Sequence, residues 1–115
     1  MVIKYANEKV ERCFCISVVM KKRVGETLAR AIKLRCDQLK AAPSFDIFLS
    51  TGLGKPHSLV GDLKGCYRIT ISRNFRLIIS PDVDSNDPAS LKKCDVVTIK
   101  GVVDYYGQKY NWLIS

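Results

Sequence analysis

The fold is decided by the stretch YRITISRNFRLII, residues 67–79. Tyr67, Ile69 and Ile71 alternate with polar residues, which is the period of a strand that buries one face. The polar residues 72–74 suit a turn, and the apolar run after them predicts a second strand. The stretch therefore predicts a β-hairpin.

Towards the N-terminus the sequence predicts one short strand and two helices. Val2–Tyr5 is β-branched and aromatic, as strands commonly are. Asn7 is placed to cap a helix in which apolar residues recur every four positions up to Val18. After Val24 apolar residues recur every three or four positions, which predicts a second helix that ends before Pro43.

Towards the C-terminus the sequence predicts loops and one more strand. Residues 45–63 hold four glycine or proline breakers and predict a structured surface loop, and the acidic residues 82–88 predict another. Residues 96–103 predict the last strand, and residues 110–114 either extend the sheet or dock on a neighbour. We therefore expect a single α+β domain over residues 1–115. Its two N-terminal helices pack on a mainly antiparallel four-stranded sheet, in the order β-α-α-β-β-β.

Charge is the unusual feature of the composition. The chain has 19 Lys and Arg against 11 Asp and Glu, a net charge of +8, and residues 1–41 alone carry ten basic and four acidic side chains. An excess of this size favours a polyanionic partner. With 47% hydrophobic and 26% charged residues, the composition is that of a globular protein and excludes a disordered or collagen-like chain.

The apolar runs and the cysteines bear on the compartment. The longest uncharged apolar stretch, Cys13 to Met20, is eight residues, against roughly 18 for a membrane span, and it has no small-residue cleavage site. We therefore expect no membrane span, no secretory signal and a cytoplasmic location. The five cysteines are scattered, which favours small buried side chains over a disulfide framework. Cys13 and Cys15 lie two positions apart, and no second Cys/His pair has the spacing of a zinc site. The sequence predicts no metal and no cofactor.

Three groups of polar residues exceed what packing requires. Each also has a plain structural interpretation: the histidine could pin a loop, the basic residues could form a solvated sheet face, and the tyrosines could pack at a strand end. The functional interpretation is proton transfer by the histidine and phosphate binding by the arginines. The groups are the loop with Lys55 and His57, the hairpin with Lys64, Arg68, Arg73 and Arg76, and the run Asp104, Tyr105 and Tyr106.

The same residues resemble a known family. The segments are LGKPHSLVGDLKGCYRI at 53–69, RNFRLI at 73–78 and VVDY at 102–105. In sequence and in order they closely resemble the HigB-type toxins of the RelE/ParE superfamily. The resemblance covers most of the chain and implies a RelE-like fold.

The resemblance also implies an activity. It is that of a toxin of a type II toxin-antitoxin system. Such a toxin is a metal-free endoribonuclease that enters the ribosomal A site, where its partners are ribosomal RNA and messenger RNA, and cuts the messenger RNA there. In that reaction the RNA 2′-hydroxyl attacks the adjacent phosphate. The resemblance also implies a partner, a helix-turn-helix antitoxin that silences the toxin. The family's catalytic positions fall on His57, Arg76, Asp104, Tyr105 and Tyr106, with Lys55, Lys64, Arg68 and Arg73 as RNA-binding residues.

One position departs from the family pattern. Tyr106 stands where the family commonly has histidine, and a phenol is a poor general base at neutral pH. Two other functions therefore stay open. One is a ParE-like inhibitor of DNA gyrase, although His57 and Asp104-Tyr105 count against it; the other is a catalytically inactive RNA-binding or regulatory module.

Overall fold

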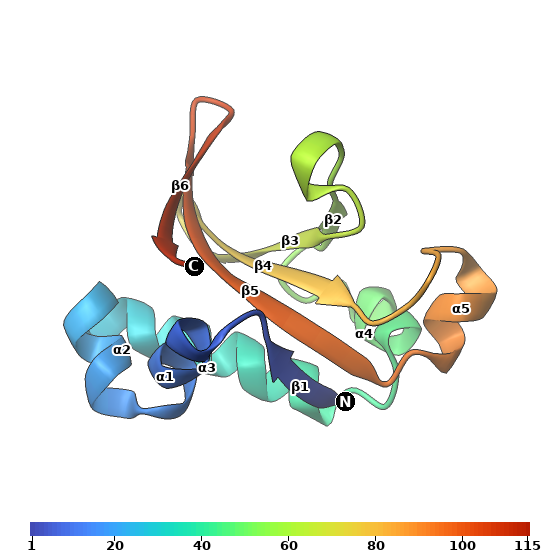
Figure 1. Cartoon of the computed structure of the whole chain (residues 1–115), viewed down its shortest axis with the longest axis horizontal. Helices are drawn as coiled ribbons and strands as arrows, with labels where there is room; N and C mark the ends of the chain where they lie inside the picture. The colour runs from blue at the N-terminus through green and yellow to red at the C-terminus, as the bar shows by residue number, and fades with distance from the viewer.

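Helices cover one face of a curved sheet in the computed structural model, which describes residues 1–115 (Figure 1). The N-terminal helices lie beneath the sheet, and the tip of the last hairpin and a short helical turn stand on its other side. In chain order the elements are β1 (Val2–Tyr5), α1 (Glu8–Cys15), α2 (Ser17–Val24), α3 (Glu26–Ala41), α4 (Phe45–Thr51), β2 (His57–Ser58), the 3-10 turn η1 (Gly61–Leu63), β3 (Tyr67–Ser72), β4 (Phe75–Pro81), α5 (Pro88–Lys93), β5 (Val96–Tyr106) and β6 (Lys109–Ile114).

The sheet is mixed but mainly antiparallel. Its strand order is β1-β5-β4-β3-β2, and β6 also pairs with β5. The first half of β5 pairs with β1 in parallel, with Val2 opposite Val96, and the second half pairs with β6 in antiparallel, with Tyr106 opposite Lys109. The expected α+β class and the predicted hairpin, β3–β4, are therefore confirmed.

The hydrophobic core lies between the helices and one face of the sheet. Tyr67, Ile69 and Ile71 of β3 are buried there with residues of α1 and α3, as their alternation predicts. The opposite face, which we call the open face, carries Arg68, Thr70 and the alternate residues of the neighbouring strands. A smaller cluster of three buried residues, Cys66, Ile78 and Val103, lies on that face.

The prediction of two helices was wrong, because the structure has five α-helices. The first predicted helix is divided into α1 and α2 because Ile16 adopts an extended backbone, with φ −113° and ψ 106°. The predicted loop from residue 45 begins instead with α4, because Ser44 caps that helix and accepts a hydrogen bond from the Ile47 amide. Phe45 and Phe48 of α4 are fully buried, so the core holds this helix in place.

The expected four strands were also too few. The structure has six, because His57–Ser58 adds a short edge strand and the C-terminal residues 109–114 add β6. The strand predicted over 96–103 continues to Tyr106, and the region after the acidic loop forms α5, which is capped by Asp87. The C-terminal segment therefore extends the sheet.

No helix combines the length and the apolar character that a membrane crossing requires. All five cysteines are free thiols, and only Cys15 among them is exposed.

Candidate functional site

Strand pairing gathers several of the predicted site residues on the open face. Residues opposite each other in antiparallel strands project to the same side. His57 of β2 lies opposite Arg68 of β3, and Arg76 of β4 lies between Thr70 of β3 and Val103 of β5. Tyr105 follows Val103 by two positions, so it shares that face. His57, Arg68, Arg76 and Tyr105 therefore come from four strands to one surface.

Arg68 is held on this surface by contacts with two tyrosines. Its guanidinium carbon lies 4.7 Å from the centre of the Tyr105 ring, a cation–π contact. One guanidinium nitrogen, Nη1, donates to the Tyr110 hydroxyl at 3.5 Å, and the Tyr105 and Tyr110 rings lie 4.9 Å apart. Burial lowers the pKa of Arg68, but the two tyrosine hydroxyls outweigh it and raise the pKa above its ordinary value. The side chain is thus a fixed, fully charged group with most of its N–H donors free.

The loop that leads to His57 is tied to β3. The Thr70 amide donates to the Gly54 carbonyl at 2.7 Å, and a side-chain carbon at Gly54 would overlap Ile69. Gly54 has a φ of +71°, so both its conformation and the close approach require glycine. Lys55 and His57 follow directly and are exposed, so the loop holds them beside the strand edge.

Arg76 is partly engaged in the β3–β4 turn. Its Nη1 donates to the Arg73 carbonyl at 2.6 Å and to the Phe75 carbonyl at 3.1 Å. Arg73 itself adopts a left-handed backbone, with φ +43°, and its side chain is exposed. Lys64 is exposed directly after η1.

Asp104 and Tyr106 project to the opposite face of β5. Asp104 lies opposite Phe75, whose ring packs against the main core, and Tyr106 is two positions further along. The Asp104 Oδ1 atom is buried without a hydrogen-bond partner, whereas the Tyr106 side chain is 71% exposed at the hairpin tip. No hydrogen bond joins His57 to either residue. The structure therefore places His57, Arg76 and Tyr105 on one face of the sheet and Asp104 and Tyr106 on the other.

Sequence reasoning missed Tyr110. Its place on β6, opposite Tyr105, puts its ring on the open face, where it packs against the cluster around Cys66, Ile78 and Val103. The alternation of β5 indicated that Tyr105 and Tyr106 would face opposite sides of the sheet. The residue that packs against Tyr105 could not be foreseen, because it lies on β6, a strand that the sequence did not predict. The signal that could have found it is the turn Gly107-Gln108 between two aromatic stretches.

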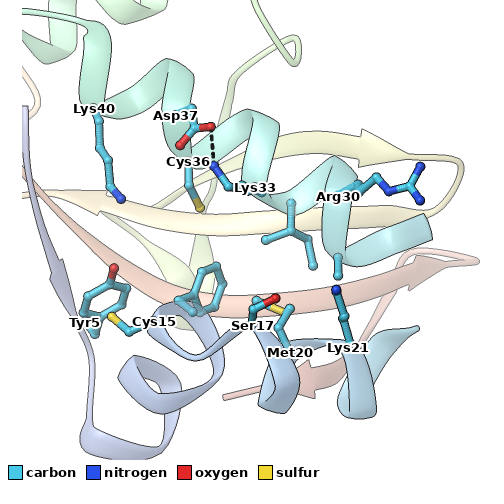
Figure 2. Close-up of a pocket in the computed structure, with 13 residues that line it drawn as sticks. Tyr5, Cys15, Ser17, Met20, Lys21, Arg30, Lys33, Cys36, Asp37 and Lys40 are labelled. Carbon is cyan, nitrogen blue, oxygen red and sulfur yellow. Dashed lines mark hydrogen bonds and ion pairs between the residues drawn. The ribbon is translucent and has the colours of Figure 1, made fainter. Parts of the chain in front are cut away.

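A cavity of about 240 Å³ lies on the other side of the molecule, between α1–α2, α3 and β1 (Figure 2). Its floor is apolar, and Tyr5, Met20 and Cys36 contribute to it. Burial raises the pKa of the Cys36 thiol to about 12, so the sulfur that points into this cavity is uncharged at neutral pH. The cavity contains none of the predicted site residues, and no group of three or more histidine, cysteine or carboxylate side chains is placed to hold a metal ion.

The fold has counterparts among solved structures. A chain of the YoeB-YefM complex from Staphylococcus aureus superposes with a TM-score of 0.56 at 17% identity, over 92% of this chain and 97% of that one. A chain of the heterotetrameric YoeB-YefM toxin-antitoxin complex from the same organism gives 0.53 at 17% identity, over 87% and 91%. No protein-family model and no curated protein sequence matches the chain. The chain therefore shares its α+β fold with a component of these complexes.

Proposed function

We propose that the chain is the toxin of a toxin-antitoxin pair and that it cleaves messenger RNA on the ribosome. The observation that carries the proposal is the pair His57 and Arg68, which lie opposite each other on the open face, with Arg68 held by Tyr105 and Tyr110. This arrangement combines a proton-transfer group with a fixed cation. Support comes from the shared fold, since the second of the similar structures is described as a toxin-antitoxin complex.

The proposed reaction needs no metal. His57 accepts the proton of the RNA 2′-hydroxyl while the 2′-oxygen attacks the adjacent phosphorus. The bond between phosphorus and the 5′-oxygen breaks, and that oxygen takes a proton from water to leave as a 5′-hydroxyl, while His57 returns its proton to the solvent. The other product is a 2′,3′-cyclic phosphate. Arg68 and Arg76 stabilise the charge that develops on the phosphate oxygens, because guanidinium groups match phosphate geometry.

The remaining predicted residues act around this centre in the proposal. Lys55, Lys64 and Arg73 are exposed at its edges and would bind neighbouring phosphates of the RNA strand. Tyr105 would support the site through Arg68, which lies over its ring. Asp104 would act only by its charge, from the other face of β5.

Tyr106 has a separate role in the proposal. Its exposed ring at the hairpin tip would stack on a base of the message. Tyr106→Leu should then weaken cleavage, whereas Tyr106→Trp should retain it. Equal rates for both variants and the wild type, measured on ribosome-bound message, would remove Tyr106 from the site.

Dependence on the ribosome follows from the loose organisation of the site. His57 is exposed and no hydrogen bond of the structure orients it, so bound ribosomal RNA and message in the A site would have to position the scissile phosphate. A helix-turn-helix antitoxin would silence the toxin by covering this surface.

The decisive experiment incubates the purified chain with programmed ribosomes and with the same message free in solution, and maps the RNA ends. Cleavage with 5′-hydroxyl ends only on ribosomes supports the proposal. Rapid cleavage of free message contradicts the ribosome dependence. Intact message in both samples, with inhibition of DNA gyrase supercoiling, would favour the gyrase inhibitor instead.

A further inference from the structure

The cavity between α1–α2, α3 and β1 has the size of a site for a small molecule (Figure 2). Its volume is about 240 Å³. An apolar cavity of about 150 Å³ is large enough to bind benzene, so this cavity has room for a ring or a short chain with a few further atoms. Pockets for drug-sized ligands begin at roughly 300 Å³. The volume therefore indicates a ligand between these two sizes.

The interior of the cavity is apolar on both walls. On the α3 wall, Ala29, Ile32 and Cys36 recur at helical spacing and are buried. The facing wall comes from β1 and from the helices on either side of the break at Ile16. It contributes Tyr5, Phe14 and Met20, and the Tyr5 and Phe14 rings lie 5.9 Å apart. A ligand inside the cavity would therefore contact hydrocarbon and sulfur atoms on two sides.

The rim of the cavity carries an excess of positive charge. Its charged side chains, all exposed, are Lys21, Arg30, Lys33, Asp37 and Lys40. Lys33 pairs with Asp37 at 2.9 Å, and Arg30 pairs with Glu26 at 3.0 Å, so these charges are compensated. Lys21 and Lys40 form no ion pair. Two uncompensated cations thus border an apolar space, and a ligand with an apolar body and a negative charge complements both features.

Lys40 and Tyr5 mark one end of the cavity. Figure 2 shows the Lys40 ammonium and the Tyr5 hydroxyl at the same end. Burial raises the pKa of Tyr5 well above its ordinary value, and the neighbouring Cys15 thiol adds to the effect, so the hydroxyl stays protonated at neutral pH. An ammonium and a phenol are both hydrogen-bond donors, and donors of this kind at one end of a cavity suit a carboxylate.

The charged rim favours a small molecule over a protein partner. A stable protein interface buries roughly 1,200–2,000 Å² and has few charged residues at its centre. A protein that covered this cavity would also have to cover the five charged side chains that border it. A small molecule fills the interior and leaves most of those charges in water.

We propose that this cavity binds a small amphipathic carboxylate. The hydrocarbon part of the ligand lies among Phe14, Met20 and Ile32, and its carboxylate lies between Lys40 and Tyr5. An alkanoate of about eight carbons, octanoate, has the size and the single charge that the cavity requires. The inference goes beyond the proposed function and does not rest on it, because the cavity contains none of the proposed RNA-binding residues and lies on the helical side of the sheet (Figure 1).

The test is a titration of the isotope-labelled chain with octanoate, followed by the NMR shifts of the backbone amides. A ligand of this size that fills the cavity should reach half-saturation at about 1 mM or below, with shifts confined to the lining residues. Octanol has the same chain without the charge and should bind about fivefold more weakly or worse. Octylammonium, which the rim repels, should bind more weakly still. Shifts that do not saturate, shifts centred elsewhere, or equal affinities for octanoate and octylammonium would overturn the proposal.

Two variants test the two ends of the cavity. Lys40→Gln should weaken octanoate about two- to fivefold, the usual effect of an exposed ion pair, and should leave octanol unchanged. Cys36→Leu adds side-chain volume where the sulfur points into the cavity, so it should abolish binding of both ligands. Its unfolding temperature shows whether the fold is kept, and Lys40→Gln, at the surface, decides the matter if it is not.

The matched control for Lys40→Gln is Lys92→Gln on α5. Lys92 is exposed and is not among the residues that line the cavity, so the net charge falls equally while the cavity is unchanged. Equal weakening of octanoate by both variants would show a response to net charge alone and would overturn the proposal. A dimer in sedimentation that octanoate dissociates would also overturn it, by assigning the cavity to a second copy of the chain. Cleavage of ribosome-bound message is measured separately, and its absence would remove the nuclease without affecting the cavity.

Discussion

Removing the Tyr110 side chain should slow RNA cleavage by releasing Arg68. Arg68 is held between a ring contact of 4.7 Å with Tyr105 and a hydrogen bond of 3.5 Å to the Tyr110 hydroxyl. The Tyr105 ring is itself placed by the Tyr110 ring, 4.9 Å away. Tyr110→Leu removes the hydroxyl and the ring together, so the guanidinium loses its hydrogen bond and the Tyr105 ring that it contacts loses its aromatic neighbour. Tyr110→Phe removes only the hydroxyl.

The size of the effect follows from these contacts. A cation–π contact contributes about 0.5–2 kcal/mol, depending on how far it is desolvated. The hydrogen bond is at the long end of the accepted range and adds little. Loss of about 1–2 kcal/mol of preorganisation corresponds to roughly a 5- to 30-fold fall in kcat/KM for Tyr110→Leu. Tyr110→Phe should cost about threefold or less.

A double-mutant cycle with Arg68→Gln tests whether Tyr110 acts through Arg68. Loss of a preorganised charge typically costs about 10²–10³ in rate, so Arg68→Gln should be much slower than wild type on programmed ribosomes. If Tyr110 acts through Arg68, Tyr110→Leu should change the Arg68→Gln rate by less than about twofold. Asn111→Ser, on the opposite face of β6, is the control. Equal losses from Tyr110→Leu in both backgrounds would refute the reasoning, because Tyr110 would then contact RNA itself.

His57→Gln should slow cleavage of ribosome-bound message by about 10²–10⁴ without changing the unfolding temperature, since proton transfer is its proposed role; a wild-type rate of appearance of the mapped ends would exclude it. Gly101→Ala should lower stability to urea by about 1–3 kcal/mol, because the glycine has φ +151° and a side-chain carbon there would overlap the Ile114 carbonyl. Burial raises the pKa of Cys36 from about 9 to about 12, so its contribution to stability is complete below pH 9 and is lost as pH rises towards 12. Cys36→Ala should therefore flatten the alkaline decline in unfolding free energy, and an unchanged decline would assign it to other groups.

The fold was predictable where one pattern dominates a stretch. The alternation in β3 and the three-to-four spacing in α3 each identify one element, because both record a face buried in the core. The break at Ile16 carries no glycine or proline, and its apolar neighbours continue the helical spacing, so the sequence joins α1 and α2. For α4, the cap Ser44 was present but the later breakers obscured it.

The candidate site was less accessible from sequence because it depends on strand register. The motif indicated His57, Arg68 and Tyr105 as residues, and their shared face follows only from the pairing of four strands. A shift of one position in β5 would have placed Asp104 on the open face instead. Tyr110 lies outside the motif, and its contact with Tyr105 depends on the turn between β5 and β6.

β5 lies late in the chain, and this position determines when the other strands can pair during synthesis. This strand pairs with β1, β4 and β6, yet it begins only at Val96. Val2 of β1 therefore has no partner until Val96 has been synthesised. Pairing over such a separation slows folding and leaves strand edges exposed during synthesis. The nascent chain is thus without the strand that joins β1, β4 and β6 until residues 96–106 have been synthesised. A cut in the exposed segment 84–87 would leave four strands of the sheet in one piece and two in the other, and these pieces could regain the fold only by associating.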